Sequence, residues 1–223
     1  MRKCGSKFLV IGQEFHKSEH KKTLIDRLTK AGIEPCLHLD KEFDVESEEL
    51  KAYHAIVIIG DDETYHLTIN KILQKNISLP IGFIPQGDLN DLCLSLGISS
   101  FDSALDNIVA QTVAKFDVLK LSTESEVKYC VSGLSLGLIP REHDASAYIN
   151  LCCARDRLCP RLLTSLDPES YTVSVDGEEH QINSHWVCVS KTKTHMHDIH
   201  SPYGSLNDGF AVVHFDVPAP NKA

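Results

Sequence analysis

The sequence predicts an α/β domain on a parallel sheet, followed by a mainly antiparallel β-sandwich domain. In the first half, short β-branched apolar runs alternate with segments of helical apolar spacing, which is typical of parallel strands joined by helical crossovers. In the second half, short strand-like runs are separated by turn signals, of which Asp176-Gly177 is the strongest. The period changes near residue 115, so we expect domains at 1–115 and 116–223.

The first domain is expected to begin with an apolar strand and a helix that ends near Gly32. The next strand contains Pro35, which interrupts its pattern. The expected elements, in order, are strand 8–11, helix 18–32, strand 33–39, helix 45–52, strand 55–59, helix 65–74, strand 81–84 and helix 101–112.

The second domain is expected to consist of strands. A hairpin would turn across 123–126, and a second would turn at Asp176-Gly177. The expected strands are 116–121, 128–132, 171–175, 180–182, 186–190 and 210–216.

Composition and charge exclude several classes of function. The chain has 223 residues, 42% of them hydrophobic, which is enough for an ordinary folded core. Its formal charge of −9 argues against nonspecific nucleic-acid binding and against strong electrostatic attachment to anionic membranes. No run approaches the roughly 20 apolar residues of a membrane span. The eight cysteines do not form a secreted framework and no signal peptide precedes them, so we expect reduced thiols and a cytoplasmic protein.

Residues 54–98 contain two polar loops that follow buried strands. Gly60–Thr64 comes after the apolar run Ala55–Ile59, and Pro85–Asp91 comes after Ile81–Ile84. Parallel strands of one sheet end at the same edge, where ligands bind in open α/β sheets. A helix that begins at this edge points free N–H groups towards it, and these favour anions.

Both loops resemble the catalytic domain of the diacylglycerol kinase/sphingosine kinase family of lipid kinases. Residues 58–70, IIGDDETYHLTIN, are similar to that family's GGDGTxNEVVN turn, and 81–98, IGFIPQGDLNDLCLSLGI, to its lGiiPaGtgNDfArsLGi loop. The two motifs occur in order, separated by a helix and a strand. The matching residues are Gly60, Asp62, Thr64 and Asn70 in the first loop, and Gly82, Ile84, Pro85, Gly87, Asn90, Asp91, Leu96 and Gly97 in the second.

The resemblance is weaker elsewhere, and overall it spans roughly residues 50–215. Ser135–Ile139 and the residues after it are similar to the sphingosine kinase version, and Ser201–Phe210 is similar to a later family motif. The family's Asn-Pro turn is absent from residues 12–18. Because the family's chain normally continues past this point, we expect the second domain to be incomplete.

The resemblance implies an α/β nucleotide domain, a β-sandwich domain and a lipid kinase activity that uses ATP and Mg²⁺. Asp62 would be the catalytic residue, acting on the lipid hydroxyl or through Mg²⁺. The implied partners are a sphingoid base, ceramide or diacylglycerol, reached at a transient membrane surface. The other implied site residues are Gly60 and Thr64 at the phosphates, Gly87, Asn90 and Asp91 at the nucleotide pocket, and Asp144 and Arg155 at the lipid; no protein-ligated metal is predicted.

The first loop departs from the family where phosphates would lie, because Asp61 and Glu63 replace glycines. Two like charges about 4 Å apart repel by roughly 4 kcal/mol at an effective dielectric of 20. The sequence therefore predicts weakened ATP binding and leaves two functions open, an impaired lipid kinase and an inactive pseudokinase that binds lipid or a protein partner in the interdomain cleft. A simpler role for the acidic turn is to cap the next helix.

Overall fold

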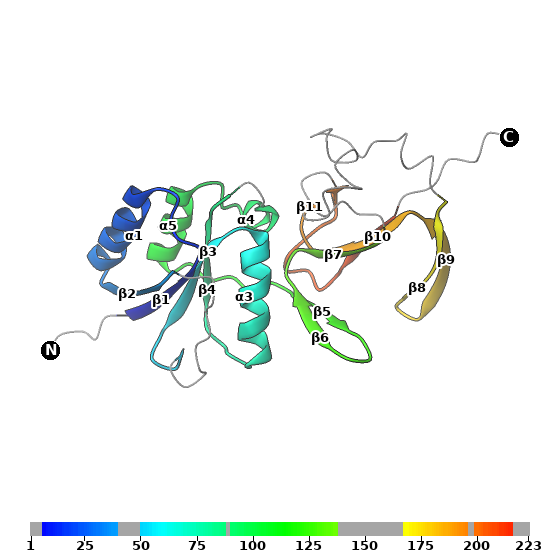
Figure 1. Ribbon diagram of the computed structural model, residues 1–223, viewed down its shortest axis with the longest axis horizontal. Helices are drawn as coiled ribbons and strands as arrows, with labels where there is room; N and C mark the ends of the chain where they lie inside the picture. Colours follow the sequence, from blue (N-terminus) through cyan, green and yellow to red (C-terminus); the bar gives the residue numbers. More distant parts are fainter. Residues whose placement is uncertain (1–5, 40–49, 88–89, 138–166, 196–198, 216–223) are drawn as a thin grey trace. The chain divides into compact units, whose positions relative to one another are not determined.

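The computed structural model describes residues 6–39, 50–87, 90–137, 167–195 and 199–215 (Figure 1). The chain divides into two compact units. Unit 1 comprises residues up to Ser132 together with Leu206–Gly209, and unit 2 comprises Gly133–Ser205 and the residues from Phe210 onward.

Unit 1 is built on a four-stranded sheet in the order β2-β1-β3-β4. The strands are β1 (Ser6–Gly12), β2 (Ile33–His38), β3 (Ala55–Gly60) and β4 (Ile81–Pro85). All three pairings are parallel, which confirms the predicted fold class. Every residue of β3 is buried, as a central parallel strand requires. Pro35 is accommodated because β2 is an edge strand.

Helices cover both faces of this sheet. Figure 1 shows α1 (Ser18–Lys30) and α5 (Phe101–Ala110) together on one face and α3 (Asp62–Gln74) on the other. Arg27 of α1 forms ion pairs with Asp102 and Asp106 of α5. A short helix, α4 (Asp91–Ser95), follows the loop after β4 and was not among the predicted elements. The predicted helix 45–52 lies largely outside the described residues.

The turn after β1 depends on a glycine. Gly12 has φ of +115°, and an added Cβ would clash with the carbonyl oxygen of Ile59. The backbone N–H of the next residue, Gln13, donates to that same oxygen at 2.9 Å. A side chain at position 12 would therefore separate β1 from β3.

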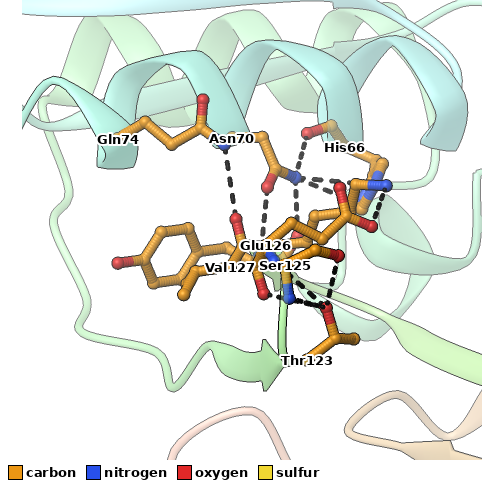
Figure 2. A network of polar contacts seen from close by, with 9 residues as sticks. His66, Asn70, Gln74, Thr123, Ser125, Glu126 and Val127 are labelled. Atoms are coloured by element: carbon orange, nitrogen blue, oxygen red, sulfur yellow. Dashed lines mark hydrogen bonds and ion pairs between the residues drawn. The ribbon is translucent and has the colours of Figure 1, made fainter.

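The hairpin of β5 (Leu119–Ser122) and β6 (Val127–Cys130) packs on α3 within unit 1. The sequence predicts this hairpin in the second domain, 116–223, whereas its contacts assign it to unit 1. Asn70 of α3 provides the attachment, and Figure 2 shows its side chain pointing from the helix towards the hairpin. Asn70 donates to the Tyr129 carbonyl at 2.6 Å and accepts from the Tyr129 N–H at 2.7 Å.

In its described part, unit 2 consists of antiparallel strands, as predicted for the second domain. One sheet has the order β13-β10-β7, and β8 pairs with β9 across Asp176 and Gly177, which both have positive φ. β7 and the short β11–β12 pair were not predicted. The strands are β7 (Gly133–Gly137), β8 (Glu169–Val175), β9 (Glu178–Ser184), β10 (Trp186–Ser190), β11 (Thr194–His195), β12 (Ile199–His200) and β13 (Val212–Phe215).

Candidate active site at the carboxyl edge of the parallel sheet

Three loops meet at the carboxyl edge of the parallel sheet. They follow β1, β3 and β4, and backbone hydrogen bonds join each to its neighbour. The N–H of Gln13 donates to the carbonyl of Ile59, and the N–H of Gln86 donates to the carbonyl of Gly60 at 2.7 Å. The two loops singled out in the sequence therefore lie side by side.

A buried glutamine connects the first and third loops. Gln86 donates through Nε2 to the carbonyl of Glu14 at 2.6 Å, and its Oε1 accepts from the N–H of His16 at 3.1 Å. This residue was missed in the sequence because nothing local marks a glutamine whose partners are 70 and 72 positions away. The Gln86 side chain holds the loop after β1 against the site.

Asp61 caps α3, as one interpretation of the acidic turn proposed. Its Oδ1 accepts from the Thr64 N–H at 2.9 Å and from the Thr64 hydroxyl at 2.7 Å. Gln13 donates through Nε2 to the same hydroxyl oxygen at 2.9 Å. Thr64 is therefore tied to Asp61 and to the loop after β1, and its backbone donor is occupied by a carboxylate.

Asp62 connects the loops after β3 and β4. Its two carboxylate oxygens accept from the backbone N–H groups of Asp91 at 2.7 Å and Leu92 at 3.1 Å. These are the first N–H groups of α4, so Asp62 supplies the cap that this short helix does not obtain from Asn90. The residue predicted to be central to catalysis therefore holds the second loop in place.

Asn90 organises the inner side of the second loop. Its Nδ2 donates to the Gly87 carbonyl at 3.0 Å, and its Oδ1 accepts from the Tyr65 hydroxyl at 3.4 Å. The Cys93 thiol in turn contacts the Tyr65 hydroxyl oxygen at 3.4 Å. Burial, followed by the nearby Cys93, raises the pKa of Tyr65, and burial raises the pKa of Cys93 to about 12. Both groups are therefore neutral donors at physiological pH.

The two glycines of the site serve different purposes. A Cβ at Gly60 would lie 2.5 Å from the Cβ of Thr64, so this glycine lets the first turn of α3 pack against β3. Gly87 has φ of +90°, and an added Cβ there would lie 3.8 Å from the Asp61 Cβ. The added Cβ would fit at that distance, so the positive φ is what favours glycine at position 87.

The edge fits the phosphates of ATP only in part. Gly87 places no side chain at the edge, but the N–H of Thr64 faces the Asp61 carboxylate and the N–H groups of Asp91 and Leu92 face Asp62. A phosphate that used the Thr64 N–H would therefore compete with Asp61. Within the residues described, no group of three or more His, Cys, Asp or Glu side chains could hold a metal ion.

The structure brings six of the eight predicted site residues to this one edge. They are Gly60, Asp62, Thr64, Gly87, Asn90 and Asp91. The predicted lipid-contacting residues Asp144 and Arg155 lie outside the described residues, as do Asp88 and Leu89 in the second loop. The roles assigned to all eight remain predictions.

Residues 12–121 match the family model for the diacylglycerol kinase catalytic domain. This part of the chain belongs to that family. The matched segment includes the three loops of the edge and every placed site residue. The resemblance seen in the two loop motifs is therefore confirmed over a continuous stretch.

Curated bacterial proteins that are similar to this chain carry the name "Putative lipid kinase". One from Staphylococcus haemolyticus is 26% identical over 140 residues, which is 60% of this chain and 44% of the relative. One from Staphylococcus aureus strain MSSA476 is 32% identical over 85 residues, or 38% of this chain and 27% of the relative. The chain thus spans less than half the length of these relatives.

Solved structures of diacylglycerol kinases share the fold of this chain. Two from Bacillus anthracis superpose with TM-scores of 0.68 and 0.67, each at 17% sequence identity. The superposed regions cover 94% and 95% of this chain, and 72% and 75% of the two solved chains, respectively. The similarity extends the family's fold beyond the matched segment into the antiparallel strands.

Two further observations concern the expectations drawn from composition. Among the described parts of the chain, no helix is both long and apolar enough to cross a bilayer. The cysteines within the described residues are thiols rather than disulfides; they are Cys36, Cys93, Cys130 and Cys188.

Proposed function

We propose that this chain is an ATP-dependent lipid kinase with low nucleotide affinity, in which Asp62 is the central residue. One observation supports this most: Asp62, which the motif resemblance equates with the family's key aspartate, joins the start of α3 to the start of α4. A kinase of this kind depends on positioning more than on covalent chemistry, so the residue that aligns its two phosphate-facing loops matters most.

When bound, ATP with Mg²⁺ would supply the phosphoryl group and neutralise its charge. The chain's own residues perform the positioning. Asp62 holds the second loop by its backbone, Asn90 holds the Gly87 carbonyl, and Gly87 places no side chain beside the Asp61 turn. Family membership supports a lipid hydroxyl as acceptor, presented by a sphingoid base, ceramide or diacylglycerol at a membrane facing the cytoplasm.

A transfer assay tests this function. The purified chain is incubated with ATP, Mg²⁺ and zwitterionic vesicles that each carry one of the three candidate lipids, and phosphate incorporated into lipid is measured. We expect one lipid to be phosphorylated, and Asp62→Ala to reduce the rate by roughly 100-fold because the second loop shifts. Asp102→Asn, which removes an exposed carboxylate on α5, is the control and should leave the rate unchanged. Absence of transfer to all three lipids would contradict the proposal.

A second candidate function is a non-catalytic member of the family that binds lipid or a protein partner. The observation that favours it is the Asp61 carboxylate on the Thr64 N–H, where a phosphate would otherwise be held. Folded protein that binds candidate lipids in vesicles, but neither binds ATP nor phosphorylates any of them, would support this candidate over the kinase.

A further inference from the structure

The Asp61 side chain lies between the two loops of the candidate site. On one side its Oδ1 accepts from the N–H and the hydroxyl of Thr64. On the other side its Cβ is 3.8 Å from where a Cβ of Gly87 would stand. The Asp61 carboxylate therefore belongs to the turn that faces Gly87 in the second loop.

An anion that uses the Thr64 N–H must compete with the Asp61 carboxylate, which already accepts from it. The first turn of a helix has N–H groups without intrahelical partners, and these favour one nearby negative charge. In α3 that charge is already present as the Asp61 carboxylate. A phosphate placed beside an intact Asp61 cap would face like-charge repulsion and would find the Thr64 N–H already bonded.

The neighbouring acids do not have this role. Asp62 directs both oxygens to the start of α4, so it acts on a different set of donors. Glu63 is exposed and lies inside α3, one residue beyond its first helical position. Of the three consecutive carboxylates, Asp61 alone caps α3 through Thr64.

We propose that Asp61 is a built-in competitor for the phosphates of the nucleotide. A ligand phosphate binds at the start of α3 only by displacing the Asp61 carboxylate from Thr64, which lowers nucleotide affinity without removing the site. This inference rests on the proposed kinase function, since it concerns the same nucleotide. It assigns the low affinity to one side chain rather than to the general acidity of the loop.

The test is a binding titration of the 223-residue chain with ATP·Mg²⁺ and, separately, with inorganic tripolyphosphate. Asp61→Ser removes the charge but retains a hydroxyl that caps helices about as well as aspartate. We expect it to tighten binding of both ligands at least tenfold over the parent chain. Glu63→Gln removes a neighbouring charge and leaves the cap, so it should tighten binding less than threefold.

Circular dichroism and the thermal midpoint report whether each variant is folded. If Asp61→Ser proved unfolded, Asp61→Asn would replace it, because its amide oxygen also accepts from Thr64. Equal affinities in the parent and the folded variant, or no binding by either, would overturn the inference. So would a Glu63→Gln effect as large as that of Asp61→Ser, since general acidity would then be the cause.

The binding result and the lipid transfer assay can fail separately. Tighter nucleotide binding by Asp61→Ser without phosphorylation of any lipid would support the competitor and contradict the kinase. Phosphorylation by the parent chain together with unchanged affinity in Asp61→Ser would support the kinase and contradict the competitor.

Discussion

At the scale of single residues, the candidate site depends on side chains that bond to backbone groups of distant loops. Asp62 reaches 29 and 30 positions along the chain to α4, and Gln86 reaches back by 70 and 72 positions to the loop after β1. Each satisfies backbone groups that a tight loop leaves without partners. Single substitutions at these positions should therefore move whole loops.

His66 provides a pH-dependent test at the same scale. Burial, followed by the positive charge of Lys128, lowers the pKa of this half-buried imidazole beside Asn70. Because the unfolded chain then binds the proton more readily, His66 favours the folded state fully above about pH 6.5 and loses this contribution as pH falls below it. We expect His66→Gln to reduce the loss of unfolding free energy between pH 7 and pH 5, measured by urea titration.

Lys128 and His214 also contribute to the pH dependence of the unfolding free energy. Lys128→Gln should also shrink the pH dependence, because the nearby positive charge is removed. Burial likewise lowers the pKa of His214 in unit 2, so the His66 variant should remove only part of the slope. A slope as steep in His66→Gln as in the parent chain would contradict the assignment.

At the scale of elements, the Asn70 side chain bonds to the backbone of the β5–β6 hairpin in the way that a neighbouring strand would. A two-stranded hairpin is marginally stable alone in water. The Asn70 amide offers a donor and an acceptor to the backbone of Tyr129, as a neighbouring strand would (Figure 2). A buried side chain of α3 thereby attaches the hairpin to unit 1.

Removing the contact between Asn70 and Tyr129 should lower the free energy of unfolding. Asn70→Ala leaves two backbone groups of Tyr129 without their side-chain partners, and we expect it to lower the unfolding free energy by about 2 kcal/mol. Gln74→Ala is the matched control one turn later, because Gln74 is exposed and its 3.5 Å contact to Val127 is long. Its effect should stay below about 0.5 kcal/mol. Equal losses in the two variants, measured by urea unfolding, would show that the paired contact has no special weight.

At the scale of the whole molecule, net charge decides how the chain can approach a lipid. With 31 acidic against 22 basic residues, the formal charge of −9 opposes attraction to anionic headgroups. The lipid substrate of the proposed kinase would then be reached by local apolar contact rather than by long-range attraction.

This charge leads to a prediction about vesicles. In a flotation assay, replacing a fifth of the zwitterionic lipid with phosphatidylserine should leave the bound fraction equal or lower, because the chain and surface repel. Raising the salt concentration should weaken this difference, since salt screens surface charges. A bound fraction that rises with phosphatidylserine and falls with salt would instead point to a local basic surface.

Patterns along the chain determined the fold class, the parallel strands and the two loops that face one another. These features follow from local periodicity and from the rule that parallel strands end at one edge. The Asp176-Gly177 turn was likewise predictable, because few residues other than glycine, asparagine and aspartate adopt its positive φ values.

Only the tertiary structure decided which side chains form hydrogen bonds with the backbone groups of the loops. Helix α4 has five residues, too few for a periodic signal, and its cap comes from Asp62 on another element. The attachment of the β5–β6 hairpin to unit 1 depends on Asn70, which is 59 positions from Tyr129. Hydrogen-bond partners this far apart are chosen by packing in three dimensions, so no local pattern contains them.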